Sequence, residues 1–190
     1  MPRKTKVAVF VDSDGTICFD KHYLADPSDL ELIPTVAEGM KKLSDAGIPV
    51  IVVTNQSGIA RGYFTDETLR KIHEHMNRTL KATGAEIQDI FYCPHLPGSG
   101  CDCRKPAAGL LRQASEKHGI DLRKSFVVGD RMMDVEMAHA VGAAGVLVPE
   151  PGDQYNVAKE IGESKEKPDF IAKDFLEAVD YVLARIEEED

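Results

Sequence analysis

The sequence predicts an α/β protein with a mainly parallel sheet flanked by helices. Short apolar runs rich in β-branched residues alternate with longer amphipathic segments, and glycine or proline separates many of them. Strands that alternate with helices at this spacing form parallel sheets with right-handed crossovers. Several of the apolar runs also end in polar side chains, at the edge where open α/β sheets place their chemistry.

The N-terminal half contains three predicted strands and two predicted helices. The run 7–11 is apolar and β-branched, segment 34–46 has apolar residues at helical spacing, and 49–54 is a second apolar run. The helix over 66–81 is preceded by a threonine N-cap and carries acids in its first turn, where the helix dipole favours them. A short third strand is expected over 87–92.

The C-terminal half continues the same alternation. Helices are expected over 107–118 and 131–141, each followed by a glycine that ends it. The stretch 152–167 has few apolar residues and is expected to be irregular. The remaining expected elements are strands over 125–128, 144–148 and 169–172, and a last helix with one apolar face over 175–188.

Length and composition indicate one globular domain spanning 1–190. The 190 residues, with 43% hydrophobic and 29% charged side chains, suffice to bury a core without disulfides. The net charge of −9 disfavours nucleic-acid and anionic-membrane partners. No apolar run approaches the roughly 18 residues of a transmembrane helix, and the first is too short for a signal peptide. We therefore expect a cytoplasmic monomer.

Polar side chains follow three of the predicted strands. Asp12 and Asp14 follow the first strand, Thr54 and Asn55 end the second, and Asp130 follows the strand over 125–128. Carboxylates gathered at such an edge suit Mg²⁺, which binds oxygen ligands and keeps waters for a substrate phosphate. A loop merely capped by aspartates is the alternative interpretation. Further charged residues expected at the same edge are Arg104, Lys105, Arg131 and Asp134.

Three of the four cysteines lie within eleven residues, close to a histidine. Cys93, His95, Cys101 and Cys103 form a Cys₃His set that suits a structural, tetrahedral Zn²⁺ site in a loop over about 93–103. Free or paired thiols are the alternative. This clustering is more typical of a metal site in a reducing compartment than of a disulfide framework. The expected role of the zinc is to aim the two basic residues that follow the loop.

Taken in order, these residues resemble the haloacid dehalogenase (HAD) superfamily of phosphatases. The four motifs are Asp12-Ser13-Asp14-Gly15-Thr16, Thr54, Lys105, and Gly129-Asp130 with Asp134. The resemblance implies a Rossmann-like HAD fold without a large cap domain. It implies that Asp12 attacks phosphorus to form an aspartyl-phosphate, that Asp14 serves as acid and then base, and that Thr54 and Lys105 hold the phosphoryl group. The implied Mg²⁺ ligands are Asp12, Asp14 through its backbone carbonyl, and Asp130, with Asp134 in support.

The cysteine loop narrows the resemblance. The pattern Cys-x-His…Cys-x-Cys-Arg-Lys-Pro is similar to D-glycero-D-manno-heptose 1,7-bisphosphate phosphatases and histidinol-phosphate phosphatases, and segment 54–62 is similar to the heptose enzymes. The resemblance implies removal of the 7-phosphate from that sugar bisphosphate. Histidinol phosphate or another small phosphate ester is the alternative substrate, and a non-catalytic zinc-loop binding module is the alternative from another class.

One position departs from the pattern of these relatives. They usually carry arginine between the two acids, where this chain has Ser13, so one cation near the phosphate is lost. The residues that the resemblance places in contact with substrate are Ser13, Asp20, His22, Tyr23, Asn55, Gln56, Ser57, Arg104 and Arg131.

Overall fold

The computed structural model describes residues 6–189, so the two ends of the expected 1–190 domain lie outside the described residues. The strands are β1 (Val9–Val11), β2 (Val50–Asn55), β3 (Asp89–Cys93), β4 (Phe126–Gly129), β5 (Ala144–Leu147) and β6 (Phe170–Ile171). The helices are α1 (Val36–Asp45), α2 (Asp66–Lys81), α3 (Gly109–His118), α4 (Met132–His139), α5 (Gln154–Glu163) and α6 (Phe175–Glu189), and two short 3₁₀ helices cover Pro27–Asp29 and Leu122–Lys124.

The sheet is parallel throughout the described residues, as the sequence predicts. Its strand order is β3-β2-β1-β4-β5-β6, and each of the five pairings is parallel. The chain moves outward from β1 to β3 and then returns to β4 on the other side of β1. This reversal creates a switch point between β1 and β4, and open α/β sheets bind ligands at the carboxyl edge beside such a point.

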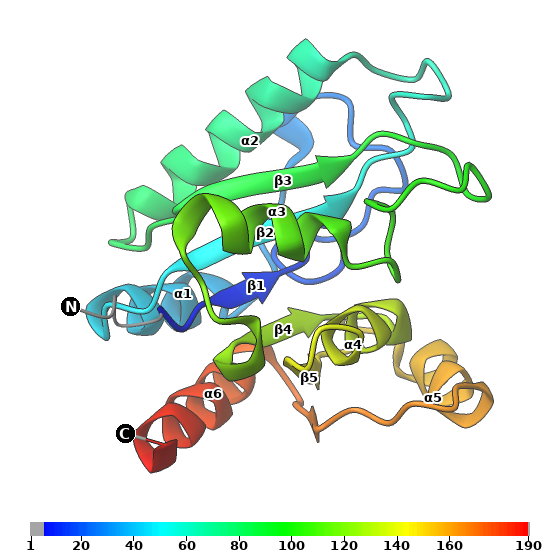
Figure 1. Ribbon diagram of the computed structural model, residues 1–190. Coiled ribbons are helices and arrows are strands. Elements are labelled where there is room, and N and C mark those ends of the chain that lie inside the picture. Colours follow the sequence, from blue (N-terminus) through cyan, green and yellow to red (C-terminus); the bar gives the residue numbers. More distant parts are fainter. Residues whose placement is uncertain (1–5, 190) are drawn as a thin grey trace.

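The helices cover both faces of the sheet (Figure 1). Side chains alternate along β1: Val9 and Val11 belong to one buried cluster, whereas Ala8 and Phe10 belong to another. The first cluster includes side chains from α1, α2 and α6, and the second includes side chains from α3 and α4. Within the described residues, no helix combines the length and apolar character needed to cross a bilayer.

The prediction of an irregular stretch over 152–167 was wrong, because α5 occupies most of it. Val157 is buried in a small cluster with Val135 and Leu147, and Ile161 packs against that cluster. Helix α5 therefore packs against α4 and β5, and a narrow apolar stripe on α5 is enough for this contact. The few apolar residues of this stretch gave little sign of a helix, since its docking surface is formed by distant parts of the chain.

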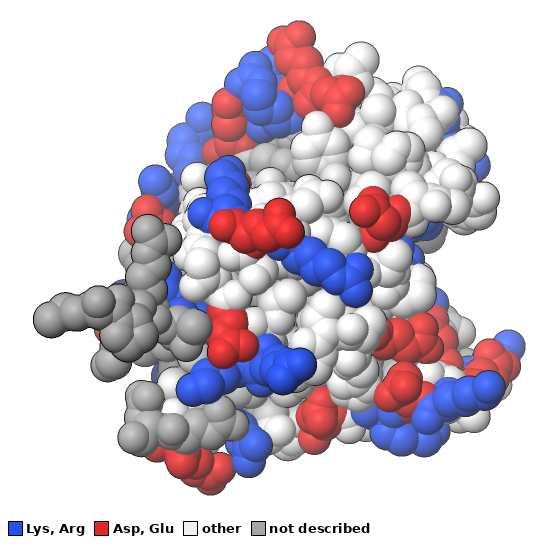
Figure 2. Space-filling view, in the orientation of Figure 1, with Lys and Arg blue, Asp and Glu red and all other residues white. Residues whose placement is uncertain are grey.

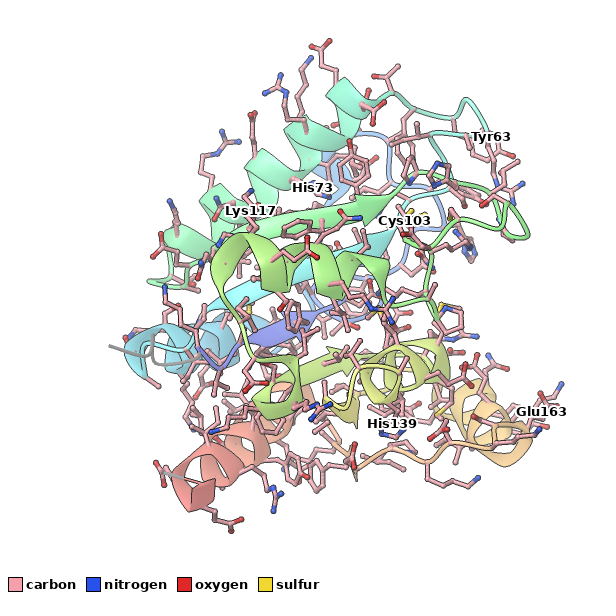
Figure 3. All side chains as sticks on the ribbon, in the orientation of Figure 1. Tyr63, His73, Cys103, Lys117, His139 and Glu163 are labelled. Atoms are coloured by element: carbon pink, nitrogen blue, oxygen red, sulfur yellow. The ribbon has the colours of Figure 1, made fainter. Side chains whose placement is uncertain are left out.

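His139, at the end of α4, ties the segment after α5 to the sheet (Figure 3). Its Nδ1 lies 2.8 Å from Glu166 Oε2 and its Nε2 lies 2.9 Å from Asp169 Oδ2. The same Asp169 oxygen accepts the backbone N–H of Gly145 at 2.7 Å. Burial alone would lower the pKa of His139, but the bonds to Asp169 and Glu166 raise it above its ordinary value.

Replacing His139 should therefore cost more stability in mild acid than in base. A raised folded-state pKa means that the protonated imidazole stabilises the fold fully below the ordinary histidine pKa, and that this contribution disappears as pH rises through the folded-state pKa. His139→Gln should lower the free energy of unfolding in urea by about 1 kcal/mol more at about pH 5.5 than at about pH 9. The control is His75→Gln, because His75 contacts Arg78 rather than a carboxylate. An equal loss at both pH values would contradict the prediction.

Candidate active site

The carboxyl ends of three central strands meet at the candidate site. Val11 of β1 pairs in register with Val52 of β2 and Val128 of β4, so the residues that follow these positions emerge at one edge of the sheet. The N–H of Asp12 donates to the carbonyl of Val128 at 3.0 Å. The strand ends that bear Asp12, Thr54 and Asp130 thus lie together, as their spacing in the sequence predicts.

Lys105 enters this edge from the cysteine loop and is buried among the acids. Its Nζ lies 2.7 Å from Asp12 Oδ1 and 2.7 Å from Asp134 Oδ1, and its side chain is 1% exposed. Asn55 Oδ1 accepts the backbone N–H of Lys105 at 3.1 Å, and the peptide bond between Lys105 and Pro106 is cis. Lys105 is therefore a fixed cation beside two carboxylates.

Three carboxyl groups crowd around the one ammonium group of Lys105. Burial and the charge of Asp12 raise the pKa of Asp130, and burial raises that of Asp134 to about 6 although Lys105 opposes this shift. Burial would lower the pKa of Lys105, but the charges of Asp12 and Asp134 raise it overall. One ammonium group thus faces three crowded carboxyl groups, two of which hold their protons more tightly than usual, and a divalent cation can take the place of those protons.

The donor set fits a hard divalent cation. Ligand oxygens of Asp12, Asp130 and Asp134 all lie within 4.8 Å of one another. Mg²⁺ takes carboxylate oxygens at about 2.0–2.1 Å, so a cation among oxygens at these separations is within reach of more than one of them. The side chain of Asp14 is not part of this group, which agrees with the expectation that Asp14 contributes its backbone carbonyl.

Glycines make the close approach of these acids possible. A Cβ at Gly15, which has a φ of +83°, would lie 2.4 Å from Asp130 Oδ2, and a Cβ at Gly129 would lie 2.2 Å from Asp134 Cγ. Thr16 completes the turn, because its Oγ1 donates to Asp130 Oδ1 at 3.3 Å. Any larger side chain at either glycine would push an acid away from its place.

Asp14 has a different environment from Asp12. Gln56 Nε2 donates to Asp14 Oδ2 at 2.8 Å and also to Thr54 Oγ1 at 3.1 Å. Burial and the neighbouring charge of Asp12 raise the pKa of Asp14 to about 7. A carboxyl group with such a pKa exchanges a proton readily near neutral pH, which is what a general acid and base requires.

Most of the residues expected to contact substrate line one pocket of about 330 Å³ beside Asp14. The pocket is formed by the loops after β1 and β2. Tyr23, which lines the pocket, contacts Tyr63 edge to face, with ring centroids 4.7 Å apart. Figure 3 shows Tyr63 on the loop between β2 and α2. The expected contact residues in its lining are Asp20, His22, Tyr23, Asn55, Gln56 and Ser57.

Three other expected contact residues lie outside that lining. Ser13 is buried, and its Oγ lies 4.0 Å from both Cys18 Sγ and Met76 Sδ; its backbone N–H donates to Asp12 Oδ1. Arg104 donates to the carbonyl of His95 at 3.2 Å. Arg131 binds two carboxylates from the α5 side of the molecule, Asp153 and Glu160.

Sequence reasoning missed several residues that shape the pocket. Glu150 Oε1 accepts the N–H of Asp20 at 2.8 Å, and Arg61 lies over the ring of Tyr23, 5.9 Å from its centroid. Arg61 lies within the segment 54–62 that resembles the heptose enzymes but was given no role there, and Tyr63 follows that segment directly. Glu150 gave none, because its contact spans 130 positions of the chain.

The four cysteine-loop residues come together as the sequence predicts. Their ligand atoms all lie within 4.8 Å of one another. Cys93 Sγ lies 3.1 Å from Cys103 Sγ and 3.7 Å from Cys101 Sγ, and His95 Nδ1 lies 3.2 Å from Cys103 Sγ. A tetrahedral Zn²⁺ with Zn–S bonds of about 2.3 Å separates its sulfur ligands by roughly 3.8 Å, so this cluster could hold zinc.

The sequence of this chain is similar to the sequences of known proteins. A family model described as HAD-hydrolase-like matches residues 102–178. The D-glycero-beta-D-manno-heptose-1,7-bisphosphate 7-phosphatase of Haemophilus ducreyi is 36% identical over 184 residues, covering 93% of this chain and 98% of that protein. The enzyme of the same name from Pseudomonas aeruginosa is 43% identical over 141 residues, covering 74% of this chain and 79% of that protein.

A solved structure shows the likeness in three dimensions. The D,D-heptose 1,7-bisphosphate phosphatase from B. bronchiseptica, complexed with magnesium and phosphate, matches with a TM-score of 0.84 and 30% identity, covering 95% of this chain and 99% of that one. The fold and the four motifs thus define a HAD-like hydrolase of phosphoric monoesters. Within that class, the chain belongs to the family of the D-glycero-D-manno-heptose-1,7-bisphosphate 7-phosphatases.

Removing one ligand of the cysteine cluster should release its metal. Cys103→Ala should lower the zinc content of purified protein from about one equivalent to well below half, and should lower the melting temperature, because metal-binding energy contributes to folding. Elemental analysis and thermal unfolding measure the two effects. The control is Cys18→Ala: Cys18 is also buried but lies outside the cluster, so that variant should keep its zinc. Equal zinc contents in the two variants would contradict a Cys₃His site.

Proposed function

We propose that this protein removes the 7-phosphate from D-glycero-D-manno-heptose 1,7-bisphosphate through an aspartyl-phosphate on Asp12. The names of the most similar relatives support this substrate, and the magnesium and phosphate in the B. bronchiseptica structure support the reaction class. The observation that carries the proposal is the buried Lys105 between Asp12 and Asp134, with Asp130 beside them. This arrangement joins a carboxylate nucleophile, a cation for the phosphoryl oxygens and a place for Mg²⁺.

The metal site and the phosphoryl site share Asp12. We assign Asp12, Asp130 and the backbone carbonyl of Asp14 as Mg²⁺ ligands, with Asp134 in support. When bound, Mg²⁺ neutralises charge on the phosphoryl oxygens and on the attacking carboxylate. Lys105 holds one oxygen of Asp12 at 2.7 Å, which leaves the other oxygen to face an incoming phosphorus atom.

The two acids divide the chemistry between them. The Asp12 carboxylate attacks phosphorus while Asp14 gives its proton to the departing sugar oxygen. Asp14, now a carboxylate, takes a proton from water, and that water attacks the aspartyl-phosphate and frees Asp12. Gln56 orients the Asp14 carboxyl group through the 2.8 Å bond to Oδ2, and Thr54 with Lys105 holds the transferring group.

The cysteine loop positions the cation of this site. We propose that the cluster at 93–103 is a structural zinc site, because four protein ligands complete a tetrahedron and leave no position for substrate. Arg104 and Lys105 follow Cys103 directly, so a fixed loop fixes both of them. The whole chain, 1–190, would then act as one HAD-like phosphatase domain.

The substrate is expected to lie along the pocket beside Asp14. We assign the pocket residues Asp20, His22, Tyr23, Asn55, Gln56 and Ser57 to substrate contacts, together with Ser13, Arg104 and Arg131, which lie outside the lining. Polar groups dominate this lining, which suits a sugar with many hydroxyl groups.

We also propose a cytoplasmic monomer without nucleic-acid or membrane partners. Four free cysteines, three of them in a metal-binding cluster, support a reducing compartment. The net charge of −9 opposes binding to polyanions. On the face shown in Figure 2, lysine and arginine are interspersed with aspartate and glutamate, which supports the same view.

Asp12→Asn should abolish Mg²⁺-dependent phosphate release from the heptose bisphosphate. An amide cannot attack phosphorus effectively, so kcat should fall by at least about a thousandfold. The control is Asp29→Asn, because Asp29 lies exposed on the first 3₁₀ helix and should leave turnover unchanged. Turnover of Asp12→Asn at the wild-type rate would contradict the mechanism.

The substrate assignment is tested by comparing kcat/KM for heptose bisphosphate and for histidinol phosphate. We expect the heptose bisphosphate to be preferred by at least about tenfold. A preference for histidinol phosphate would contradict the substrate while leaving the phosphatase chemistry intact. Failure to hydrolyse any phosphate ester in the presence of Mg²⁺ would instead favour a non-catalytic binding module.

A further inference from the structure

The segment from the end of β5 through α5 supplies three carboxylates that bind residues expected to contact substrate. Glu150 binds the backbone N–H of Asp20, on the loop that lines the pocket. Glu160 and Asp153 both bind the guanidinium of Arg131: Glu160 Oε1 pairs with Nη2, and Asp153 Oδ2 lies 3.4 Å from Nη1. This one segment therefore contacts two of the residues expected to bind substrate, Asp20 and Arg131.

Glu160 connects Arg131 to the start of α4. Its second oxygen, Oε2, accepts the backbone N–H of Met132 at 3.1 Å, so one carboxylate bridges the guanidinium and the first turn of the helix. The side chains of Glu160 and Asp153 are 26% and 24% exposed, whereas that of Arg131 is 41% exposed. The carboxylates are therefore the more shielded partners, and the side chain of Arg131 is the more exposed one.

The pairing leaves Arg131 able to bind another anion. A guanidinium carries five N–H groups in a planar fork, and the two contacts engage one on each terminal nitrogen. An unpaired arginine side chain samples many rotamers and must lose that freedom when substrate binds. The two carboxylates fix the Arg131 guanidinium when the protein folds, so less conformational entropy is lost when substrate binds.

We propose that Glu160 and Asp153 are positioning residues that hold Arg131 ready for an anionic group of the substrate. The inference rests on the proposed function, in which Arg131 contacts substrate. Thr54 and Lys105 hold the phosphoryl group that is transferred, so Arg131 meets a part of the substrate that does not react. Its positioning then affects substrate binding more than the chemical step, and KM more than kcat.

Glu160→Gln tests this role in steady-state kinetics. Glu160 uses one oxygen for Arg131 and the other for the Met132 N–H, and an amide has only one acceptor oxygen, so the variant cannot keep both contacts in their present positions. We expect KM for the heptose bisphosphate to rise by about fivefold and kcat to change by less than about twofold. The matched control is Glu163→Gln on the same helix, where Glu163 is 69% exposed and points away from the body of the protein (Figure 3). That variant should keep the wild-type KM.

A double-mutant cycle separates positioning from general damage to α5. In an Arg131→Ala background, Glu160→Gln should raise KM no further, because the group it positions is gone. Asp153→Asn provides a second variant if Glu160→Gln folds poorly, and it should raise KM by a smaller factor.

The outcomes distinguish this inference from the function on which it rests. A KM for Glu160→Gln equal to or below that of the wild type, or the same rise in the Arg131→Ala background, would contradict the positioning role while the wild type stays active. A wild type that releases no phosphate would contradict the proposed function itself, and the positioning role with it.

Discussion

The ammonium group of Lys105 lies between the carboxylates of Asp12 and Asp134, 2.7 Å from each, at a depth where its side chain is 1% exposed. Breaking a buried ion pair by removing one partner typically costs about 3–5 kcal/mol, because the other charge is left uncompensated. Here one cation serves several acids, including Asp130 close by. The site therefore depends on Lys105 for its assembly, and its crowded carboxyl groups suit a divalent cation.

The rest of the structure brings this cation and these acids together. Parallel strands in register place Asp12 and Asp130 on neighbouring strand ends at the switch point of the sheet. Gly15 and Gly129 leave room for the acids, since a Cβ at either would overlap a carboxyl group. The cysteine loop, which follows β3, places Lys105 beside these acids. A sheet, two glycines and a metal-binding loop thus converge on one buried charge cluster.

Much of this site could be predicted from the sequence, and the reasons are local. Asp12, Thr54 and Asp130 each end an apolar run, and parallel strands bring such ends together whatever the details of packing. The side-chain environment of Ser13 and the helix α5 could not be predicted in this way. Ser13 turns toward Met76 because of tertiary packing, and α5 is stabilised by a docking surface on α4 and β5. The contacts of Glu150 with Asp20 and of Glu160 with Arg131 join distant parts of the chain, so no local pattern marks them.

The central claim is that Asp12 carries the phosphoryl group during turnover. Quenching the enzyme with acid while it hydrolyses substrate, reducing with borohydride and mapping peptides by mass spectrometry tests this directly, since borohydride reduces an aspartyl-phosphate to homoserine. The account predicts homoserine at position 12 only when substrate and Mg²⁺ are both present. Active turnover with no modification at position 12, or with a phosphoryl group trapped on another residue, would contradict it.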